Sequence, residues 1–517
     1  MTESDVVRSS RATVHWLLRG VVVIAATLSL AQAGLVGGPA GPFVLPVLLQ
    51  SVVVLVGIEV SRASRTGLRV DALTLFLGWE SLRGCVAPVI IQWFGSGGNF
   101  FWRPGTDADA TVVLYLGLAF AATVVVTRAT AGALAAAAGD RTRRATGAAV
   151  RSPLVTVPPL VDGPLTPAVF IALGLVGLVL RFPDVASVTS FLAGDIDGLQ
   201  RNDVVPKGPI TFFSEVARPL LFIGLAMLMR KRHRAGSSTW WLVLPVLGSV
   251  VFALGSYGLR RAVMAFAVIA LVFVLLDRSS RRIRLVPSVA AVAVLGAFFF
   301  GAGTLRSTLW LERTGLEAPE VGIVPALQSV LVYAASPMQL SGAMPWAAET
   351  GAFTPWTFVL SLLGPVPGIP DEWRLQSGVA LFNHAVYHSF VGRDQLVPTW
   401  FEGYLSFGVP GVFGVGLVFG LLMLLSDRMR TRLQSFPAAY AAAIVALWVS
   451  QPSAVGTYSI FQNLLCYALP PLFLVAVGSV LPARALGPRQ PFVPTTAVDP
   501  APPRHQTTRS LTGRPTT

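Results

Sequence analysis

The sequence is poor in charged residues and in cysteine. Only 12% of its 517 residues are charged, whereas 53% are hydrophobic, and the mean hydropathy is +0.67. Soluble domains are about 25% charged, so this composition excludes an ordinary soluble domain. The two cysteines, Cys85 and Cys466, both lie in hydrophobic segments. That placement excludes a disulfide framework and argues against a metal–thiolate site.

Lysine is nearly absent as well, because Lys207 and Lys231 are the only lysines among 39 basic residues. Arginine supplies the rest, and together with frequent Ala, Gly and Pro this bias is typical of a GC-rich bacterial genome. The net charge is +14. In so hydrophobic a chain, this charge indicates membrane topology and attraction to anionic lipid headgroups, and it does not indicate a nucleic-acid partner.

Hydrophobic runs are abundant. A transmembrane helix needs roughly 20 mainly apolar residues, and the sequence predicts about twelve such helices. The predicted spans are 20–36, 42–60, 72–94, 111–127, 164–180, 211–229, 239–256, 262–276, 286–304, 403–425, 436–453 and 459–481. We therefore expect an all-α fold, a polytopic transmembrane helical bundle of about 12 spans in the bacterial plasma membrane.

The placement of arginine predicts how this bundle is oriented. Arginines cluster in every second loop, at 62–69, 141–144, 230–234, 278–284 and 428–432. Because cytoplasmic loops carry the excess of arginine and lysine, both termini are predicted to be cytoplasmic. The same reasoning places the largest polar loop, between spans 9 and 10, outside the cell.

The chain divides into five predicted parts and has no internal repeat. They are a cytoplasmic N-terminal tail at 1–19, spans 1–9 at 20–304, a large external loop at 305–402, spans 10–12 at 403–483 and a disordered cytoplasmic tail at 484–517.

Three further local features are expected. We expect disorder up to about residue 11 and an interfacial amphipathic helix with a linker at 129–160. The loop contains apolar stretches at 324–335 and 353–363, too short to span a bilayer. These two stretches are predicted to form interfacial or re-entrant helices that roof a cavity.

Two predicted spans carry a carboxylate and an arginine three residues apart, Glu80 with Arg83 and Glu215 with Arg218. At this spacing on a helix the two side chains are neighbours. Each pair then either neutralises itself and braces the bundle or lines a polar pathway through the membrane.

Two adjacent arginines, Arg260 and Arg261, follow a small-residue turn at a predicted external membrane edge. Their position runs against the distribution of positive charge and favours an anionic partner. The planar fork of arginine suits phosphate, and two forks suit a diphosphate. The alternative is that both side chains reach to lipid headgroups.

The external loop holds His384 and His388, four residues apart. They are open to three interpretations: zinc ligands, a general base that accepts a proton from a sugar hydroxyl, or histidines with local hydrogen bonds. The Asp-x-Asp runs at 107–109 and 195–197 similarly either hold a divalent ion or are ordinary acidic loop residues. No metal site and no cofactor is predicted.

Short motifs resemble those of the bacterial O-antigen or oligosaccharide repeat-unit polymerases. They are Trp400-Phe401-Glu402-Gly403-Tyr404-Leu405-Ser406-Phe407-Gly408 at the start of a span, Gly258-Leu259-Arg260-Arg261, and the Pro-rich stretch at 363–370. The resemblance covers roughly residues 170–480. In this family a large external loop also lies in the C-terminal half.

The resemblance implies a metal-independent membrane glycosyltransferase that makes cell-surface polysaccharide or exopolysaccharide. The donor would be a glycan on a polyprenyl diphosphate, and the acceptor a repeat unit on the same carrier. Further expected partners are the lipid bilayer, a flippase and chain-length regulator proteins. Diphosphate-binding candidates are Arg260, Arg261, Arg201, Arg218 and Arg306, and the candidates for the catalytic base are His384, His388 and Glu402.

Two alternatives stay open. An O-antigen ligase-like enzyme would use nearly the same site with a different acceptor. A lipid-linked oligosaccharide flippase or transporter would need coupling charges at both membrane depths. A dolichol-phosphate-type glycosyltransferase is disfavoured, because the first external loop at 36–41 has no carboxylate.

Overall fold

The described part of the chain is entirely helical, with short turns between helices. The structure is a computed structural model, and the residues it describes are 3–36, 41–64, 67–95, 105–146, 166–181, 209–234, 269–271, 274, 324, 337–387, 397–433 and 435–480. These residues contain no strand. The all-α prediction is therefore confirmed.

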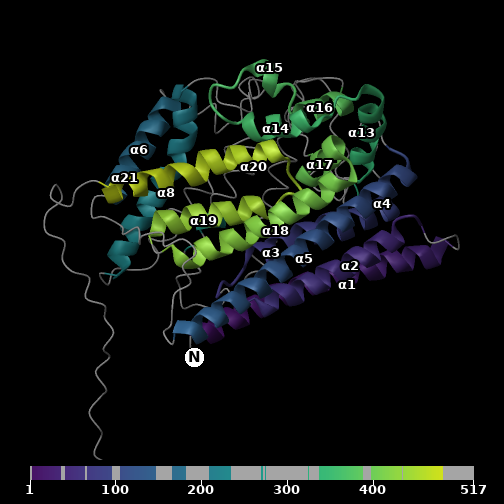
Figure 1. The fold of residues 1–517 in the computed structure, drawn as a ribbon, viewed down its shortest axis with the longest axis horizontal. Coiled ribbons are helices and arrows are strands. Elements are labelled where there is room, and N and C mark those ends of the chain that lie inside the picture. Colours follow the sequence, from purple (N-terminus) through teal and green to yellow (C-terminus); the bar gives the residue numbers. More distant parts are fainter. Residues whose placement is uncertain are drawn as a thin grey trace, which may run out of the picture.

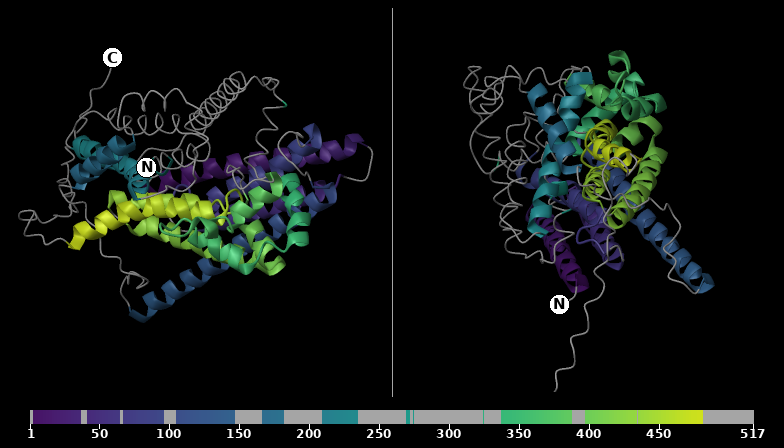
Figure 2. Two further views of the ribbon diagram at one scale, coloured as in Figure 1. Left: turned by 90° about the horizontal axis from the view of Figure 1, so that it is seen from above. Right: turned by 90° about the vertical axis from the view of Figure 1, so that its left-hand side faces the viewer.

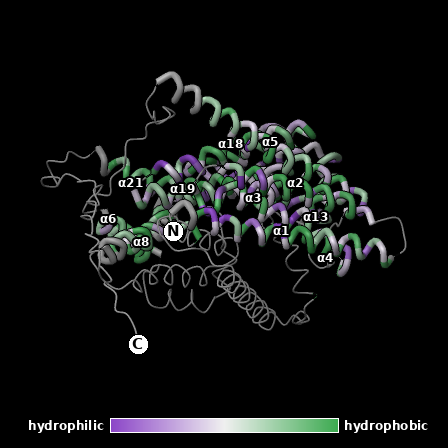
Figure 3. Tube along the Cα trace, turned by 90° about the horizontal axis from the view of Figure 1, so that it is seen from below, coloured by the Kyte–Doolittle hydropathy of each residue, from purple (hydrophilic) through white to green (hydrophobic). Residues whose placement is uncertain are grey.

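A set of long helices forms the body of the molecule (Figure 1). They are α1 (Glu3–Val36), α2 (Val44–Ala63), α5 (Asp107–Thr146), α18 (Val409–Arg432) and a third span made of α3 (Ala72–Glu80), η1 (Ser81–Val86) and α4 (Ala87–Phe94). Helix α5 packs against both α2 and α18, and α1 packs against α2. Hydrophobic residues predominate along these helices (Figure 3).

The remaining helices pack around this body. Helix α6 (Thr166–Arg181) pairs with α8 (Pro209–Arg234). The C-terminal helices are α19 (Phe436–Val449), α20 (Thr457–Asn463), η3 (Leu464–Ala468) and α21 (Leu469–Val480). Five shorter helices lie together over one end of the bundle, namely α13 (Pro337–Thr350), α14 (Pro355–Leu363), α15 (Asp371–Arg374), α16 (Gly378–Tyr387) and α17 (Thr399–Phe407) (Figure 1). We call these five helices the cap.

The protein is a multi-pass membrane protein. Six described segments are long and apolar enough to cross a membrane: Val7–Leu35, Val44–Ala63, Ala72–Phe94, Asp107–Ala138, Val409–Arg432 and Thr457–Val477. They coincide with six of the predicted spans. Predicted spans at 164–180, 211–229 and 436–453 correspond to shorter apolar helices. Spans predicted at 239–256 and 286–304, and most of 262–276, lie outside the described residues. The count of twelve and the orientation stay predictions.

Disorder at the N-terminus was wrongly predicted for the part that the structure describes. Helix α1 already begins at Glu3. The guanidinium group of Arg11 donates hydrogen bonds to the backbone oxygen atoms of Ser64, at 2.8 Å, and of Leu68. These contacts hold the first turns of α1 against the end of α2, which the local composition does not reveal.

Two other boundaries differ from the sequence prediction. Helix α5 continues to Thr146 with no break near 129, and its last part projects from the bundle (Figure 2). The tenth span begins at Val409 rather than 403, because Gly408 interrupts the helix with a φ of 66°. This left-handed conformation suits glycine. A Cβ atom on Gly411 would lie 2.1 Å from the oxygen of Gly403, so the two helices meet backbone to backbone.

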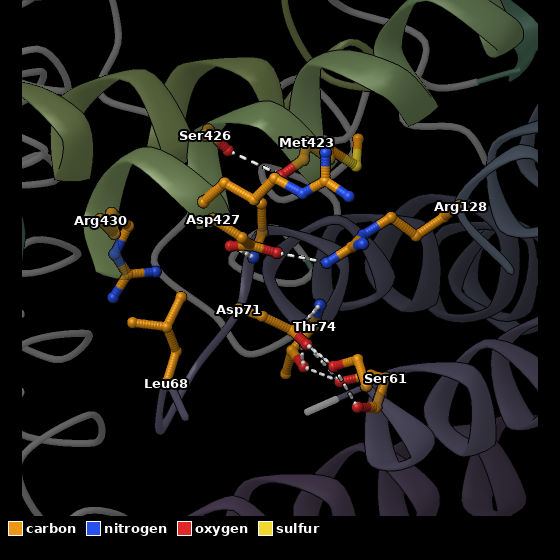
Figure 4. A network of polar contacts seen from close by, with 12 residues as sticks. Ser61, Leu68, Asp71, Thr74, Arg128, Met423, Ser426, Asp427 and Arg430 are labelled. Carbon is orange, nitrogen blue, oxygen red and sulfur yellow. Dashed lines mark hydrogen bonds and ion pairs between the residues drawn. The ribbon is translucent and has the colours of Figure 1, made fainter. Parts of the chain in front are cut away.

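A polar network joins four helices at the end opposite the cap (Figure 4). Asp427 of α18 accepts a hydrogen bond from Arg128 of α5 at 2.6 Å and another from the Ala72 N–H at 2.9 Å. Asp71 caps α3 by accepting from the Thr74 N–H at 2.8 Å, and it also accepts from Ser61 of α2 at 2.8 Å. Every partner in this network is buried, so it fixes the four helices relative to one another.

Burial acts to raise the pKa of Asp71, but the hydrogen bonds from Thr74 and Ser61 and the charge of Arg11 outweigh it. The pKa of Asp71 is therefore below its usual value, and the group stays ionised. An ionised Asp71 keeps accepting these hydrogen bonds across the physiological pH range.

Removal of one partner of the Arg128–Asp427 pair is expected to destabilise the protein strongly. Arg128→Met removes the ion-pair partner of a buried carboxylate, on which the positive charge of Arg430 then still acts, and this should lower the free energy of unfolding by about 3–5 kcal/mol. Adding Asp427→Asn removes the unpaired charge and keeps an oxygen atom for the Ala72 N–H, so most of the loss should be recovered. Unfolding of the purified chain in detergent measures both variants. A double variant no more stable than the single one would contradict this expectation.

Candidate functional site

The cap contains the predicted base candidate Glu402, which lies on α17 and is 1% exposed. One carboxyl oxygen accepts a hydrogen bond from the Ser361 hydroxyl of α14 at 3.0 Å. The other accepts from the Thr457 N–H, at the first turn of α20, at 2.7 Å. Ser361 in turn accepts from the Gly378 N–H at 2.8 Å. Glu402 therefore connects α14, α16, α17 and α20.

Packing around this carboxyl group is tight. A Cβ atom at Gly378 would lie 2.3 Å from a carboxyl oxygen of Glu402, so only glycine fits at the start of α16. Burial raises the pKa of Glu402 to about 7, although the hydrogen bonds from Thr457 and Ser361 act to lower it. Near neutral pH, both the protonated and the ionised form of the carboxyl group are populated.

His384, the second base candidate in the cap, is half-buried on α16. Its ring stacks on Trp346 of α13, with 5.8 Å between ring centroids and 26° between planes. One turn of the same helix also carries the buried Phe382, whose ring meets Phe401 of α17 edge-on at 6.4 Å. These aromatic contacts hold α13, α16 and α17 together and fix the position of the imidazole.

The side chains of the other six predicted site residues lie outside the described part of the structure. Arg218 lies on α8, where its side chain is outside the described part of the structure. The residues Arg201, Arg260, Arg261, Arg306 and His388 lie outside the described residues. The apolar stretch predicted at 353–363 forms α14, whereas only one residue of 324–335 is described. Among the Asp-x-Asp residues, Asp109 accepts a hydrogen bond from Thr106 at 2.6 Å in the first turn of α5.

The predicted pair of Glu80 and Arg83 is arranged differently from a simple ion pair. The π-helical segment η1 begins directly after Glu80 and adds a residue to the turn. Glu80 accepts hydrogen bonds from Gln50 of α2, at 2.7 Å, and from Ser453 before α20. None of the ion pairs between described residues includes Arg83. The two charges attract each other without a direct contact, and each also has a partner of its own.

The guanidinium group of Arg83 lies over the ring of Trp400, 4.4 Å from its centroid. Both Arg83 and Glu80 line a pocket between the third span, α2, α5 and the cap. Its lining also includes Gln50, Gly84, Gly117 and Pro337.

Sequence reasoning missed Gln50, Ser453 and Trp400 as partners of these charges. A signal was present for Gln50, because it is an amide in the middle of an apolar run, and polar groups at that depth mark functional or structural sites. No comparable signal existed for Trp400, because its contact with Arg83 depends on how α17 folds back against the third span.

Comparisons of this chain with protein-family models, with curated proteins and with solved structures found no match.

The raised pKa of Glu402 is expected to make the folded protein more stable in acid. A pKa of about 7, against 4.5 for an ordinary glutamate, means that the folded state binds the proton more tightly than the unfolded state does. This contribution is fully present below about pH 4.5 and is lost as the pH rises to about 7, a fall of ~3 kcal/mol.

Glu402→Gln should remove this pH dependence, because glutamine stays neutral while accepting from the Thr457 N–H and donating to Ser361. Unfolding of both proteins at about pH 5 and about pH 8 provides the measurement. Equal slopes for the two proteins would contradict the assignment of a raised pKa.

Proposed function

We propose that this chain is a membrane glycosyltransferase that polymerises polyprenyl-diphosphate-linked oligosaccharide repeat units at the external face of the bacterial plasma membrane. The observation that carries the proposal is the cap, which holds a half-buried imidazole, His384, and a buried carboxyl group, Glu402, over one end of a membrane bundle. A lipid carrier in the membrane would present its sugar at that boundary. The metal-independent chemistry then needs a base and a group that binds diphosphate.

The reaction would be a substitution at the anomeric carbon of the donor sugar. An acceptor hydroxyl forms the new glycosidic bond, the bond to the diphosphate breaks, and the diphosphate leaves with the electron pair. The hydroxyl proton passes to a base. Positive charge from Arg260 and Arg261 is the proposed stabiliser of the leaving diphosphate.

Between the base candidates of the described cap, we assign the base to His384. Both oxygen atoms of Glu402 already accept hydrogen bonds and the residue is 1% exposed, so a sugar hydroxyl has no access to it. Glu402 instead holds α14 and α17 together beneath the site. His384 is the remaining base candidate of the described cap, and a ring nitrogen of imidazole can accept a proton from a hydroxyl group.

A flippase or transporter is the second candidate, and one observation favours it. Buried charges also lie at the opposite end of the bundle, where Arg128 pairs with Asp427. A transporter uses charged groups at both depths. An O-antigen ligase-like enzyme would differ from a polymerase only in its acceptor.

Lipid-linked glycans from a strain lacking this protein separate these functions. A polymerase predicts that single lipid-linked repeat units accumulate on the external face and that long polymer disappears. Arg260→Ala and Arg261→Ala should give the same products at normal protein level. Units trapped on the cytoplasmic face would favour the flippase, and full-length lipid-linked polymer that is never transferred would favour the ligase.

His384→Ala is expected to reduce polymer formation by about 10²–10⁴-fold, the usual contribution of a general base. The exposed Glu372→Gln on α15 is a matched control within the cap and should leave the rate unchanged. Glu402→Gln should retain most of the activity if Glu402 only positions the cap helices. Pulse labelling of polymer in membranes with equal protein measures all three. A fully active His384→Ala variant would refute the assignment of the base.

A further inference from the structure

The Arg83 side chain is a buried cation that forms no direct ion pair among the described residues, although the charge of Glu80 attracts it from nearby. It is 6% exposed, and its Nε–H has no hydrogen-bond partner in the part of the chain that the structure describes. Taking a guanidinium group out of water is costly unless a partner replaces its hydration. Trp400 covers one face of the group, but an aromatic ring contacts only the face and leaves the N–H groups at the edge without acceptors.

The pocket reaches the edge of this guanidinium group. At Gly117 on α5, a Cβ atom would lie 3.7 Å from one terminal nitrogen of Arg83 and 3.9 Å from the other. The absence of a side chain there leaves space beside both nitrogen atoms. These are the two donors with which arginine binds a planar or tetrahedral oxyanion in a bidentate manner.

The nearby carboxylate of Glu80 does not fill this role. One of its oxygen atoms accepts from Gln50 and the other from Ser453. Both oxygen atoms of Glu80 are therefore occupied by neutral donors, so Glu80 attracts Arg83 through its charge but accepts no hydrogen bond from it. The first residue of α13, Pro337, also lines the pocket, so the cap forms part of the wall around the guanidinium group.

We propose that the Arg83 pocket binds a phosphate anion, which a lipid carries or which is free in solution. The guanidinium edge donates to the phosphate oxygen atoms, and Trp400 holds the guanidinium plane in the orientation that this contact needs. This inference rests on the proposed function only in the choice of a lipid diphosphate as a probe. The anion site is inferred from the residues around Arg83.

Binding can be measured with the full chain in nanodiscs of phosphatidylcholine, which carry no net charge. The probes are inorganic diphosphate and farnesyl diphosphate, and calorimetric titration gives the Kd of each. We expect saturable binding by at least one probe. Arg83→Gln should weaken that binding by about tenfold or more, since a charge-assisted bidentate contact is lost. Arg83→Lys should give an intermediate Kd, because it keeps the charge without the fork.

Gly117→Ala is the variant that separates binding from folding. The added methyl group would make only ordinary contacts with Trp400, at 3.6 Å, and with Arg83, and alanine favours the helix. It nevertheless occupies the space beside the guanidinium group, so the Kd should rise by about threefold or more. Arg62→Gln changes an arginine that is 69% exposed and serves as the control with an unchanged Kd.

Binding of farnesyl diphosphate alone would identify the anion as lipid-borne, and equal binding of both probes would identify a site for free phosphate anions. The proposal is overturned if neither probe binds the wild-type chain, or if the Gly117→Ala and wild-type proteins bind equally. Should Arg83→Gln fail to fold, the comparison with Gly117→Ala decides alone. The titration measures binding and not glycan synthesis. Its outcome therefore does not depend on the outcome of the lipid-linked glycan assay that tests the proposed function.

Discussion

The hydrogen bonds of Glu402 connect the cap to the rest of the molecule. A single carboxyl group accepts from Ser361 on α14 and from the first turn of α20, while it packs against Gly378. Because α20 continues into a membrane-spanning segment, these bonds transmit the position of the bundle to α14 and α16. The same helix that carries Glu402 also carries Trp400, which lies against Arg83 inside the bundle. The geometry of both candidate sites therefore depends on where α17 sits.

Buried charged side chains in the described bundle are stabilised in three different ways. Arg128 and Asp427 neutralise each other directly. Glu80 is stabilised by the neutral donors of Gln50 and Ser453. Arg83 has the face of an aromatic ring and, without direct contact, the charge of Glu80. The charged oxygen atoms of Asp427 and Glu80 all have donors, which is sufficient for a structural role. The N–H groups of Arg83, by contrast, have no acceptor among the described residues. Charged groups of this kind in membrane proteins are usually functional.

Much of the helical framework follows from the sequence, because hydrophobic length is a strong signal. The segments predicted at 42–60 and 72–94 agree with the helices within a few residues. The π-helical turn inside the third span is not predictable in this way. It lies where Gly84 contacts Gln50, whose side chain would be 2.5 Å from a Cβ atom at that position. That contact joins residues on different helices and has no local signature.

The candidate site was predictable only in part for the same reason. Glu402 and His384 could be singled out from their residue type and their place in the loop. The partners that define the environment of Glu402 are 41 and 55 residues away in sequence. Hydrophobic periodicity describes which face of a helix is buried, and it carries no information on which hydroxyl or N–H group that face will meet.

The two ends of the bundle differ in a way that bears on function. At the end opposite the cap, Asp71 receives four hydrogen bonds, from Ser61, Ser64 and Thr74, and one of these comes from the backbone of α3. A group that couples transport has to exchange partners during each cycle, and a carboxylate that already accepts four hydrogen bonds from α3 and the end of α2 is poorly suited to that. At the cap end, by contrast, the N–H groups of Arg83 have no acceptor among the described residues. This difference supports the proposed chemistry at one face over transport across both.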